Sequence, residues 1–213
     1  MVIAHYHRNE AAAAALVSSL GSGEIVQADL SDEAAVEQMI TNVRPSLLVN
    51  NAAAQPVTAM ADMTFAEWRA VLGANLDSAF LVSQRAALAW IAAGKTGAIV
   101  NIGSIEGLDP AAGHSHYATS KAGLTMLTRA AALEFGPANI RVNCVSPGLI
   151  DRESLARDWP DGVARWQDRV PLGRIGSAID VADAVLFLLS PAARWISGAN
   201  LVVDGGMSAQ SKW

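Results

Sequence analysis

Tyr117 and Lys121, four residues apart in Tyr-Ala-Thr-Ser-Lys, are the side chains whose spacing most clearly suggests chemistry. On a helix, residues at this spacing lie on one face, one turn apart. A free phenol has a pKa of about 10 and stays protonated at neutral pH. A nearby ammonium group favours the phenolate, so the pair could exchange a proton with a bound oxygen atom near neutral pH. The same spacing also occurs in helices that carry a solvated lysine and a packing tyrosine, so the pair alone decides nothing.

Other residues at fixed distances from this pair make the pattern specific. With them, the chain resembles the short-chain dehydrogenase/reductase family from about residue 2 to residue 207. Several landmarks occur in the family's order and at its spacings. They are Asn50-Asn51-Ala52-Ala53 after the apolar Leu47-Leu48-Val49, then Ala74-Asn75-Leu76, Ile99 to Ser104, Tyr117 to Lys121, Ser146-Pro147-Gly148, and Asn200 to Gly206.

The resemblance implies an NAD(P)(H)-dependent oxidoreductase that interconverts a carbonyl and a secondary alcohol by hydride transfer. Tyr117 would be the acid/base, and Lys121 would lower the pKa of Tyr117 and bind the nicotinamide ribose. Ser104 would orient the substrate oxygen and stabilise its developing charge. Asn75, which lies in a helical pattern that it weakens, would bend the helix and hold a water linked to Lys121.

The resemblance also assigns cofactor contacts wherever positions match. Ala53 replaces the family's usual Gly, and Arg152 stands where the family usually has Thr. The implied cofactor-binding residues are Asp29 and Leu30 near the adenine, Asn50, Ala52 and Ala53 near its ribose, and Pro147, Gly148 and Ile150 near the nicotinamide, with Tyr117 and Lys121.

The segment after the first expected strand, His5-Tyr6-His7-Arg8-Asn9, indicates the cofactor type. NAD-specific sites of this kind place an acidic residue here, whereas an Arg accommodates the 2′-phosphate of NADP. Arg8 can bind a phosphate through paired N–H donors. The segment is also similar to the corresponding stretch of NADPH-dependent pteridine reductases, which carry an Asp where this chain has Ser104. We therefore favour NADP(H) over NAD(H), with a solvated Arg8 as the alternative.

One family element has no counterpart in this sequence. Family members begin with a strand and a Gly-rich turn that binds the pyrophosphate at a helix N-terminus. Here no glycine precedes Gly21, and the first βα unit is missing. Because the missing strand is central in the family's sheet, we expect the first two strands to separate from the rest, or the first to pair with the third. The chain is then either a truncated enzyme or a short form that has impaired cofactor binding and acts as a hydride-independent enzyme or a non-catalytic partner.

Short apolar runs alternate with longer helical stretches, which indicates an α/β, Rossmann-like, doubly wound parallel sheet in a single domain, residues 1–213. We expect the charged, Trp-containing residues 151–170 to form a mobile lid over the substrate. The expected strands start at Val2 and cover about 24–29, 46–50, 97–104, 140–145 and 199–203. The expected helices cover about 9–20, 32–42, 65–93 with breaks near Gly73 and Asn75, 116–135 and 180–190.

Composition excludes several classes of protein. No apolar run reaches the eighteen or so residues that span a bilayer, and no secretory signal is present, so we expect no membrane partner and a cytoplasmic location. A net charge of −5 without a basic cluster argues against a nucleic-acid partner. The single cysteine, Cys144, cannot form an internal disulfide and reads as a buried strand thiol.

The resemblance implies a small carbonyl or alcohol substrate, which the sequence does not identify further. Glu106, His114 and Trp159 are candidate substrate contacts, while a solvated Glu106 and a packing Trp159 are the alternatives. His114 and His116 form a His-x-His pair without a third ligand, so we expect no metal site and place both at the rim of the pocket. Small residues such as Ala130-Ala131-Ala132 permit close helix approach. In the family that this chain resembles, these long helices pack against a second subunit, so we expect a homo-oligomer, a dimer or tetramer.

Overall fold

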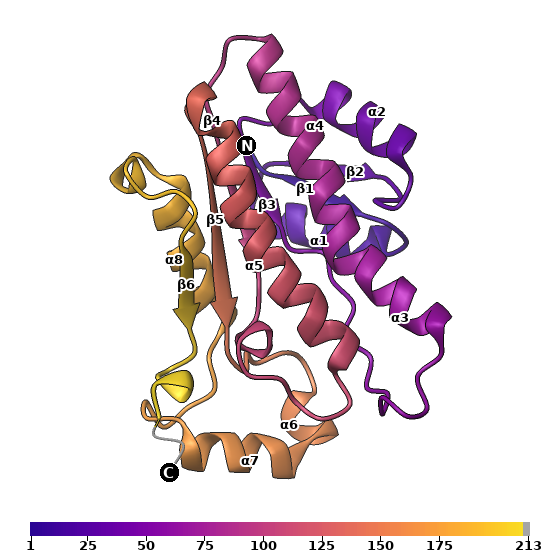
Figure 1. Ribbon diagram of the computed structural model, residues 1–213, viewed down its shortest axis with the longest axis vertical. Coiled ribbons are helices and arrows are strands. Elements are labelled where there is room, and N and C mark those ends of the chain that lie inside the picture. Colours follow the sequence, from indigo (N-terminus) through magenta and orange to yellow (C-terminus); the bar gives the residue numbers. More distant parts are fainter. Residues whose placement is uncertain (211–213) are drawn as a thin grey trace.

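The computed structural model describes residues 1–210 and has the expected alternation of strands and helices (Figure 1). The element bounds agree with the expected ones to within a few residues. The strands are β1 Ile3–Tyr6, β2 Glu24–Gln27, β3 Leu47–Asn50, β4 Gly97–Ile102, β5 Ile140–Pro147 and β6 Asn200–Val203. The helices are α1 Glu10–Ser19, α2 Glu33–Val43, α3 Phe65–Leu72, α4 Ser78–Ala92, α5 Ser115–Phe135, α6 Leu155–Asp158, α7 Pro160–Arg169 and α8 Ala178–Leu189.

Every strand pairing is parallel, but within residues 1–210 the strands form two sheets. One contains β1 and β2, and the other has the order β3-β4-β5-β6. The edges of β1 and β3 are not paired with each other, which is the first of the two arrangements expected without a central strand. The fold is therefore the predicted α/β architecture, with its sheet divided between β1 and β3.

Helix packing joins the two sheets on one face. Helix α2 follows β2 and packs against α4, which covers β3 and β4. Their apolar side chains, with those of α5, form one core cluster that includes Val36, Ala86, Trp90, Ile99 and Val142. Arg85 of α4 adds ion pairs with Glu33 and Glu37 of α2.

The opposite face of the larger sheet is covered by α8, so this sheet is helix-covered on both sides as a doubly wound fold requires. Val100 and Val145 of the sheet pack there against Val185 and Leu188. Figure 1 shows α6 and α7 beyond the C-terminal ends of β5 and β6, at one end of the sheet. No helix within residues 1–210 is long and apolar enough to cross a membrane.

The long helical stretch around residues 65–93 is broken where its sequence suggested. A capping box between Thr64 and Glu67 starts α3. A π-helical turn, Gly73–Asp77, then separates α3 from α4 and contains Asn75, which is 1% exposed. π-Helical turns inside helices often occur at functional sites, because they redirect one side chain.

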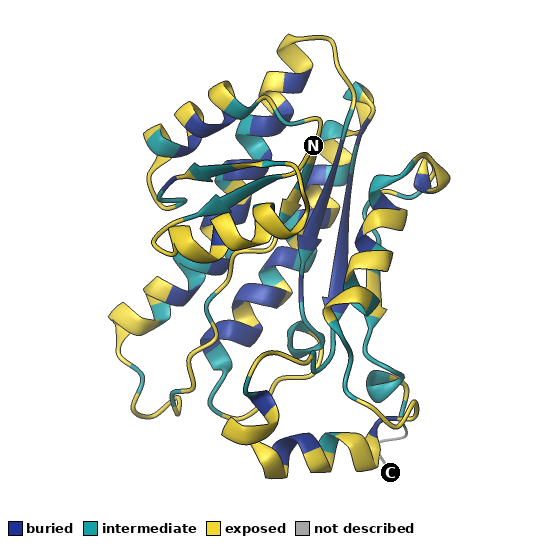
Figure 2. Ribbon diagram, turned by 180° about the vertical axis from the view of Figure 1, so that it is seen from behind, coloured by how far each residue is buried: buried dark blue, intermediate teal, exposed yellow. Residues whose placement is uncertain are grey.

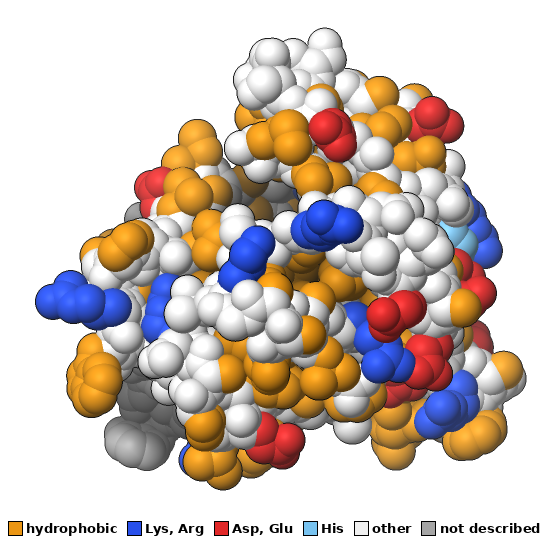
Figure 3. Space-filling view, turned by 90° about the horizontal axis from the view of Figure 1, so that it is seen from above, with side chains coloured by type: hydrophobic (Ala, Val, Ile, Leu, Met, Phe, Trp, Pro, Cys, Tyr) orange, Lys and Arg blue, Asp and Glu red, His pale blue; other side chains and the backbone are white. Residues whose placement is uncertain are grey.

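Neither basic nor acidic side chains dominate the face drawn in Figure 3. Over the described residues there, Lys and Arg side chains are scattered among Asp, Glu and hydrophobic ones. This face therefore offers no continuous basic surface of the kind that binds nucleic acid.

Candidate active site

The site is built where the end of β4 meets the first turns of α5. Ser104 follows β4, and Tyr117 and Lys121 face it from successive turns of α5. Gly107 lets the loop after Ser104 lie close to α5, since a Cβ there would meet the backbone of Lys121 and Ala122 at about 2.9 Å. The structure thus brings together three of the four predicted catalytic residues.

Lys121 lies beneath this site with almost no solvent exposure. Its Nζ donates a hydrogen bond to the carbonyl oxygen of Ile102, at 2.7 Å, and lies 5.6 Å from the centroid of the Tyr117 ring. Burial disfavours the ammonium form and lowers the pKa of Lys121 from 10.5 to about 8. Lys121 is consequently a cation that can lose its proton more readily than a solvated lysine.

The pKa of Tyr117 corrects one expectation. Burial of the phenol raises its pKa above 10.0, a hydrogen bond with the Ser104 side chain acts in the opposite direction, and the Glu106 carboxylate raises it further. The expected net lowering of the Tyr117 pKa is not found in this structure, because burial of the phenol is the largest effect and raises the pKa. The neutral phenol is therefore the resting form.

Asn75 is held by backbone and side-chain partners around the π-helical turn. Its amide accepts a hydrogen bond from the Ala54 N–H, at 2.7 Å, and donates to the Ala54 carbonyl oxygen and the Ser120 hydroxyl. The expected break in the helix is confirmed, and Asn75 ties the loop after β3 to α5. The water link between Asn75 and Lys121 stays a prediction.

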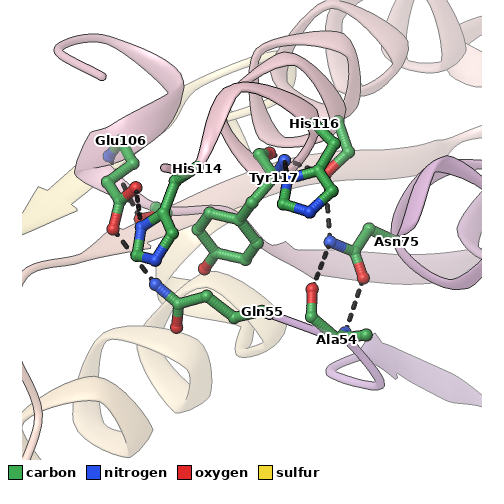
Figure 4. A network of polar contacts seen from close by, with 9 residues as sticks. Ala54, Gln55, Asn75, Glu106, His114, His116 and Tyr117 are labelled. Carbon is green, nitrogen blue, oxygen red and sulfur yellow. Dashed lines mark hydrogen bonds and ion pairs between the residues drawn. The ribbon is translucent and has the colours of Figure 1, made fainter. Parts of the chain in front are cut away.

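A polar cluster of Gln55, Glu106 and His114 lies beside the Tyr117 hydroxyl (Figure 4). The Glu106 carboxylate pairs with His114 Nδ1 at 2.7 Å and accepts a hydrogen bond from the Gln55 amide at 3.0 Å. The His114 and Tyr117 rings meet edge to face, with centroids 6.0 Å apart. Glu106 and His114 were predicted as substrate contacts, and the structure puts both beside the candidate acid/base.

Gln55 was missed by sequence reasoning, and His116 was misplaced. Gln55 lies 51 residues before Glu106, and its only sequence signal is a polar side chain in the loop after Asn50-Asn51-Ala52-Ala53. His116, expected at the pocket rim, is fully buried. Its Nδ1 accepts the backbone N–H of Tyr117, so it fixes the start of α5 instead.

The candidate residues for the adenine end lie on the smaller sheet. Arg8 lines a cavity of about 520 Å³ at the end of β1, with its neighbours His5 to Asn9 and the first turns of α1. Asp29, after β2, accepts hydrogen bonds from Ser31, which together with nearby His7 and Arg8 lower its pKa. The exposed Arg8 guanidinium at this mostly apolar cavity can pair with a phosphate of a dinucleotide.

The other adenine-side candidates are arranged less favourably. The Asn50 amide donates to Ser83 at 2.8 Å and to Asn101 at 2.7 Å, so its side chain is turned into the protein and only its backbone could face a cofactor. Leu30 packs against the core cluster. Ala52 and Ala53 are exposed in the loop after β3.

The candidates for the nicotinamide end follow β5. Pro147 ends the strand, the Gly148 N–H donates to the Val203 carbonyl, and Ile150 bridges to Gly176. Ile150 also lines a second cavity, of about 430 Å³, between β6 and the segment that precedes α8. Among residues 1–210, no three His, Cys, Asp or Glu side chains are grouped to hold a metal ion.

The segment 151–170 contains α6 and α7 with Trp159 between them. The Trp159 side chain is 47% exposed, and the Arg165 guanidinium lies over its ring at 5.9 Å. The ring packs so closely on Gly162 that a Cβ there would overlap it. In this structure Trp159 is thus engaged with its own segment.

Three comparisons with known proteins agree on the family. A family model described as enoyl-(acyl carrier protein) reductase matches residues 1–208. L-xylulose reductase of Mesocricetus auratus is 39% identical over 202 residues, which cover 93% of this chain and 83% of that protein. L-rhamnose 1-dehydrogenase (NAD(P)(+)) of Azotobacter vinelandii is 36% identical over 220 residues, which cover 97% and 86%. The crystal structure of acetoin dehydrogenase from Salmonella typhimurium matches with a TM-score of 0.86 and 32% identity, covering 98% of this chain and 87% of that one.

The family model covers almost the whole chain, and each of these relatives is an oxidoreductase by name. The chain belongs to the short-chain dehydrogenase/reductase family of oxidoreductases.

Proposed function

We propose that this protein interconverts a carbonyl and a secondary alcohol with a nicotinamide cofactor, with Tyr117 as the acid/base. The observation that carries the proposal is that the Ser104 side chain lies close enough to the Tyr117 phenol to act on its pKa, with Lys121 Nζ 5.6 Å from the centroid of the Tyr117 ring. Asn75, Ser104, Tyr117 and Lys121 together form the proposed catalytic set.

Each side chain has a role that follows from its position. The substrate oxygen would accept hydrogen bonds from both Ser104 and Tyr117, which polarises the carbonyl. During reduction, the neutral Tyr117 phenol would give its proton to this oxygen as charge develops there. Lys121, a buried cation near the ring, would stabilise the resulting phenolate. The bound nicotinamide would supply or accept the hydride.

We propose NADP(H) as the preferred cofactor. Arg8 is an exposed residue that lines an open cavity, where its guanidinium can pair with a 2′-phosphate. His7 and Asp29 would flank the adenosine end, while Lys121 would bind the nicotinamide ribose and Ile150 the carboxamide. The remaining contacts would come from Leu30, Asn50, Ala52, Pro147 and Gly148.

The substrate would be a small hydroxylated carbonyl compound or the alcohol derived from it. Two of the relatives carry sugar names, L-xylulose reductase and L-rhamnose 1-dehydrogenase, and a third is an acetoin dehydrogenase. The polar Glu106–His114 pair supports a polar rather than an aliphatic substrate. Residues 151–170 would close over the substrate as a lid, with Trp159 in the turn between α6 and α7.

We also propose a cytoplasmic homo-oligomer, a dimer or tetramer. Support comes from apolar side chains that α4 and α5 leave exposed, which a second subunit would cover. These are Phe80, Leu88, Ile91, Met126 and Leu133.

One observation favours the second candidate, a protein with impaired cofactor binding that acts without hydride transfer or only as a partner. The edges of β1 and β3 are not paired with each other, and within residues 1–210 no Gly-rich turn leads from a strand between them into a helix. Such a turn is what binds the pyrophosphate in dinucleotide-binding folds.

A titration of the purified chain with NADPH separates the two candidates. The proposed function predicts saturable quenching of tryptophan fluorescence and oxidation of NADPH in the presence of small hydroxyketones. If neither saturable binding nor turnover occurs, the second candidate replaces the first.

A further inference from the structure

The strongest unexplained feature beside Tyr117 is the pairing of a carboxylate and an imidazole, Glu106 and His114, at 2.7 Å. Glu106 and His114 belong to the short turn after Ser104 and to the N-terminal cap of α5. Their side chains are only 18% and 15% exposed. Removing such a pair from water carries a desolvation penalty that their attraction only partly offsets. A pair kept at this position is therefore better explained by a ligand than by stability.

His114 has hydrogen-bonding capacity that the protein leaves unused, and Glu106 uses one of its two oxygens only for an exposed side chain. His114 Nε2 is buried and has no hydrogen-bond partner among the described residues. The second carboxylate oxygen, Glu106 Oε1, is bound by the amide of Gln55, an exposed residue. Figure 4 shows this amide alongside the His114 ring and near the Tyr117 hydroxyl. Gln55 thus occupies the position that a polar ligand group would take.

The chemistry of the pair favours a hydroxyl as that group. A hydroxyl can donate one hydrogen bond and accept another, whereas a carbonyl can only accept and an ammonium can only donate. It could donate to the Glu106 carboxylate while it accepts from, or instead donates to, the imidazole nitrogen. A methyl group in the same place would leave His114 Nε2 and one oxygen of Glu106 without partners, which is unfavourable.

The position of the pair indicates which hydroxyl it would bind. A reacting oxygen would contact the Tyr117 hydroxyl, and the His114 ring lies in edge contact with the Tyr117 ring at 6.0 Å between centroids. The hydroxyl that the pair recognises would then be carried by the carbon next to the reacting one. Gln55 would move aside, since a single hydrogen bond to Glu106 holds its exposed side chain.

We propose that Glu106 and His114 are specificity-determining residues that select substrates with a hydroxyl on the carbon beside the reacting carbonyl, that is, α-hydroxy carbonyl compounds and the corresponding vicinal diols. Gln55 is the side chain that these substrates displace. The proposal rests on the proposed function of this site, and it adds the substrate class and the residues that recognise it.

The test compares hydroxyacetone with butanone, which differ by a hydroxyl in place of a methyl group. Wild-type protein with NADPH should prefer hydroxyacetone by at least about tenfold in kcat/KM, as expected where a site is built to hydrogen-bond a hydroxyl. His114→Phe and Glu106→Gln should remove most of that preference, measured as the ratio of kcat/KM for hydroxyacetone to kcat/KM for butanone. Glu134→Gln, an exposed substitution far along α5, should keep the preference.

A second measurement does not depend on turnover. The ring signals of His114 in the proton NMR spectrum should shift on addition of hydroxyacetone without cofactor, and should not shift with butanone. If both ketones are reduced equally well, the proposed selection is wrong while the proposed function stands. If neither ketone is reduced, the proposed function fails, and the NMR titration decides the selection: a shift specific to hydroxyacetone supports it, and its absence overturns it.

Discussion

The two sheets of this protein differ in how completely their neighbours bury them. In the larger sheet, Ile99, Val100 and Val142 are 0% exposed, with helices on both faces. In the smaller sheet, every residue of β1 is partly exposed and both ends of β2 are exposed. Figure 2 shows β4 and β5 buried along most of their length, whereas the outer side of α1 faces solvent. Within α1, only Ala13 is buried.

This difference corresponds to a division of chemical roles. The proposed proton-transfer groups, Ser104, Tyr117 and Lys121, lie on the well-buried sheet and its helix α5. The groups proposed to choose the cofactor, Arg8 and Asp29, lie on the smaller sheet, which packing of α2 against α4 attaches to the rest. The larger sheet and its helices thus fix the positions of the proposed proton-transfer groups, while the smaller sheet contributes mainly exposed charged side chains.

The largest expected effect is on turnover. Tyr117→Phe removes the phenol hydroxyl and keeps the ring, so we expect kcat to fall by about 10²- to 10⁴-fold, the usual contribution of general acid–base catalysis. Steady-state oxidation of NADPH with a hydroxyketone measures this. The unfolding midpoint should hardly change, because the ring that packs at 8% exposure is kept. A variant with half the wild-type rate would overturn the acid/base assignment.

A pair of matched truncations tests the comparison of the sheets directly. Ile99→Ala removes a fully buried side chain of β4 and should lower the free energy of unfolding by about 2–5 kcal/mol. Ile25→Ala removes the same atoms from the partly exposed β2, and about 1 kcal/mol or less is expected because less apolar area is involved. Urea denaturation followed by circular dichroism gives both values. Equal losses would show that the smaller sheet is as tightly packed as the larger.

The sequence predicted features that depend on neighbouring residues. The breaks near Gly73 and Asn75 follow from poor helix formers inside a helical pattern, and the structure has its π-helical turn there. The helix starts expected near residues 9 and 32 agree with the structure, in which the Asn9 and Asp32 side chains accept backbone N–H groups as N-caps.

Features that depend on tertiary contacts could not be predicted in the same way. The contact of Gln55 with Glu106 joins two loops from different βα units. The raised pKa of Tyr117 comes mainly from burial, which no local spacing reveals. Similarly, the Asn50 amide turns inward because Ser83 and Asn101 happen to lie beside it.

A pH-dependent effect of a few kcal/mol should come from Lys121. Because burial lowers its pKa from 10.5 to about 8, the unfolded chain binds this proton more tightly than the native protein does. Stability contributed by this residue therefore rises as pH increases from about 8 to 10.5. Relative to Lys121→Met, the wild-type protein should gain about 3 kcal/mol across that window, at about 1.4 kcal/mol per pKa unit.

Urea denaturation of both proteins at several pH values measures this difference. Tyr117 and Cys144, whose raised pKa values act in the opposite direction, are present in both proteins and largely cancel. Parallel curves for the two proteins would mean that Lys121 is not held in a site that disfavours its charge.

The smallest expected effect is on cofactor affinity at the smaller sheet. Arg8→Ala should raise the Kd for NADPH by about tenfold, because a charge-assisted hydrogen bond to the 2′-phosphate is lost at a solvated site. The Kd for NADH should change little, since NADH has no phosphate there. Fluorescence titrations at two salt concentrations measure the Kd values for NADPH and NADH. Higher salt should reduce the difference in Kd for NADPH between the wild-type protein and Arg8→Ala. The Kd of Arg8→Lys for NADPH should lie between those of the wild-type protein and Arg8→Ala, because an ammonium keeps the charge without the paired donors. Equal weakening of NADPH and NADH would instead mean that Arg8 supports the smaller sheet as a whole, and the division of roles between the two halves would then not extend to cofactor choice.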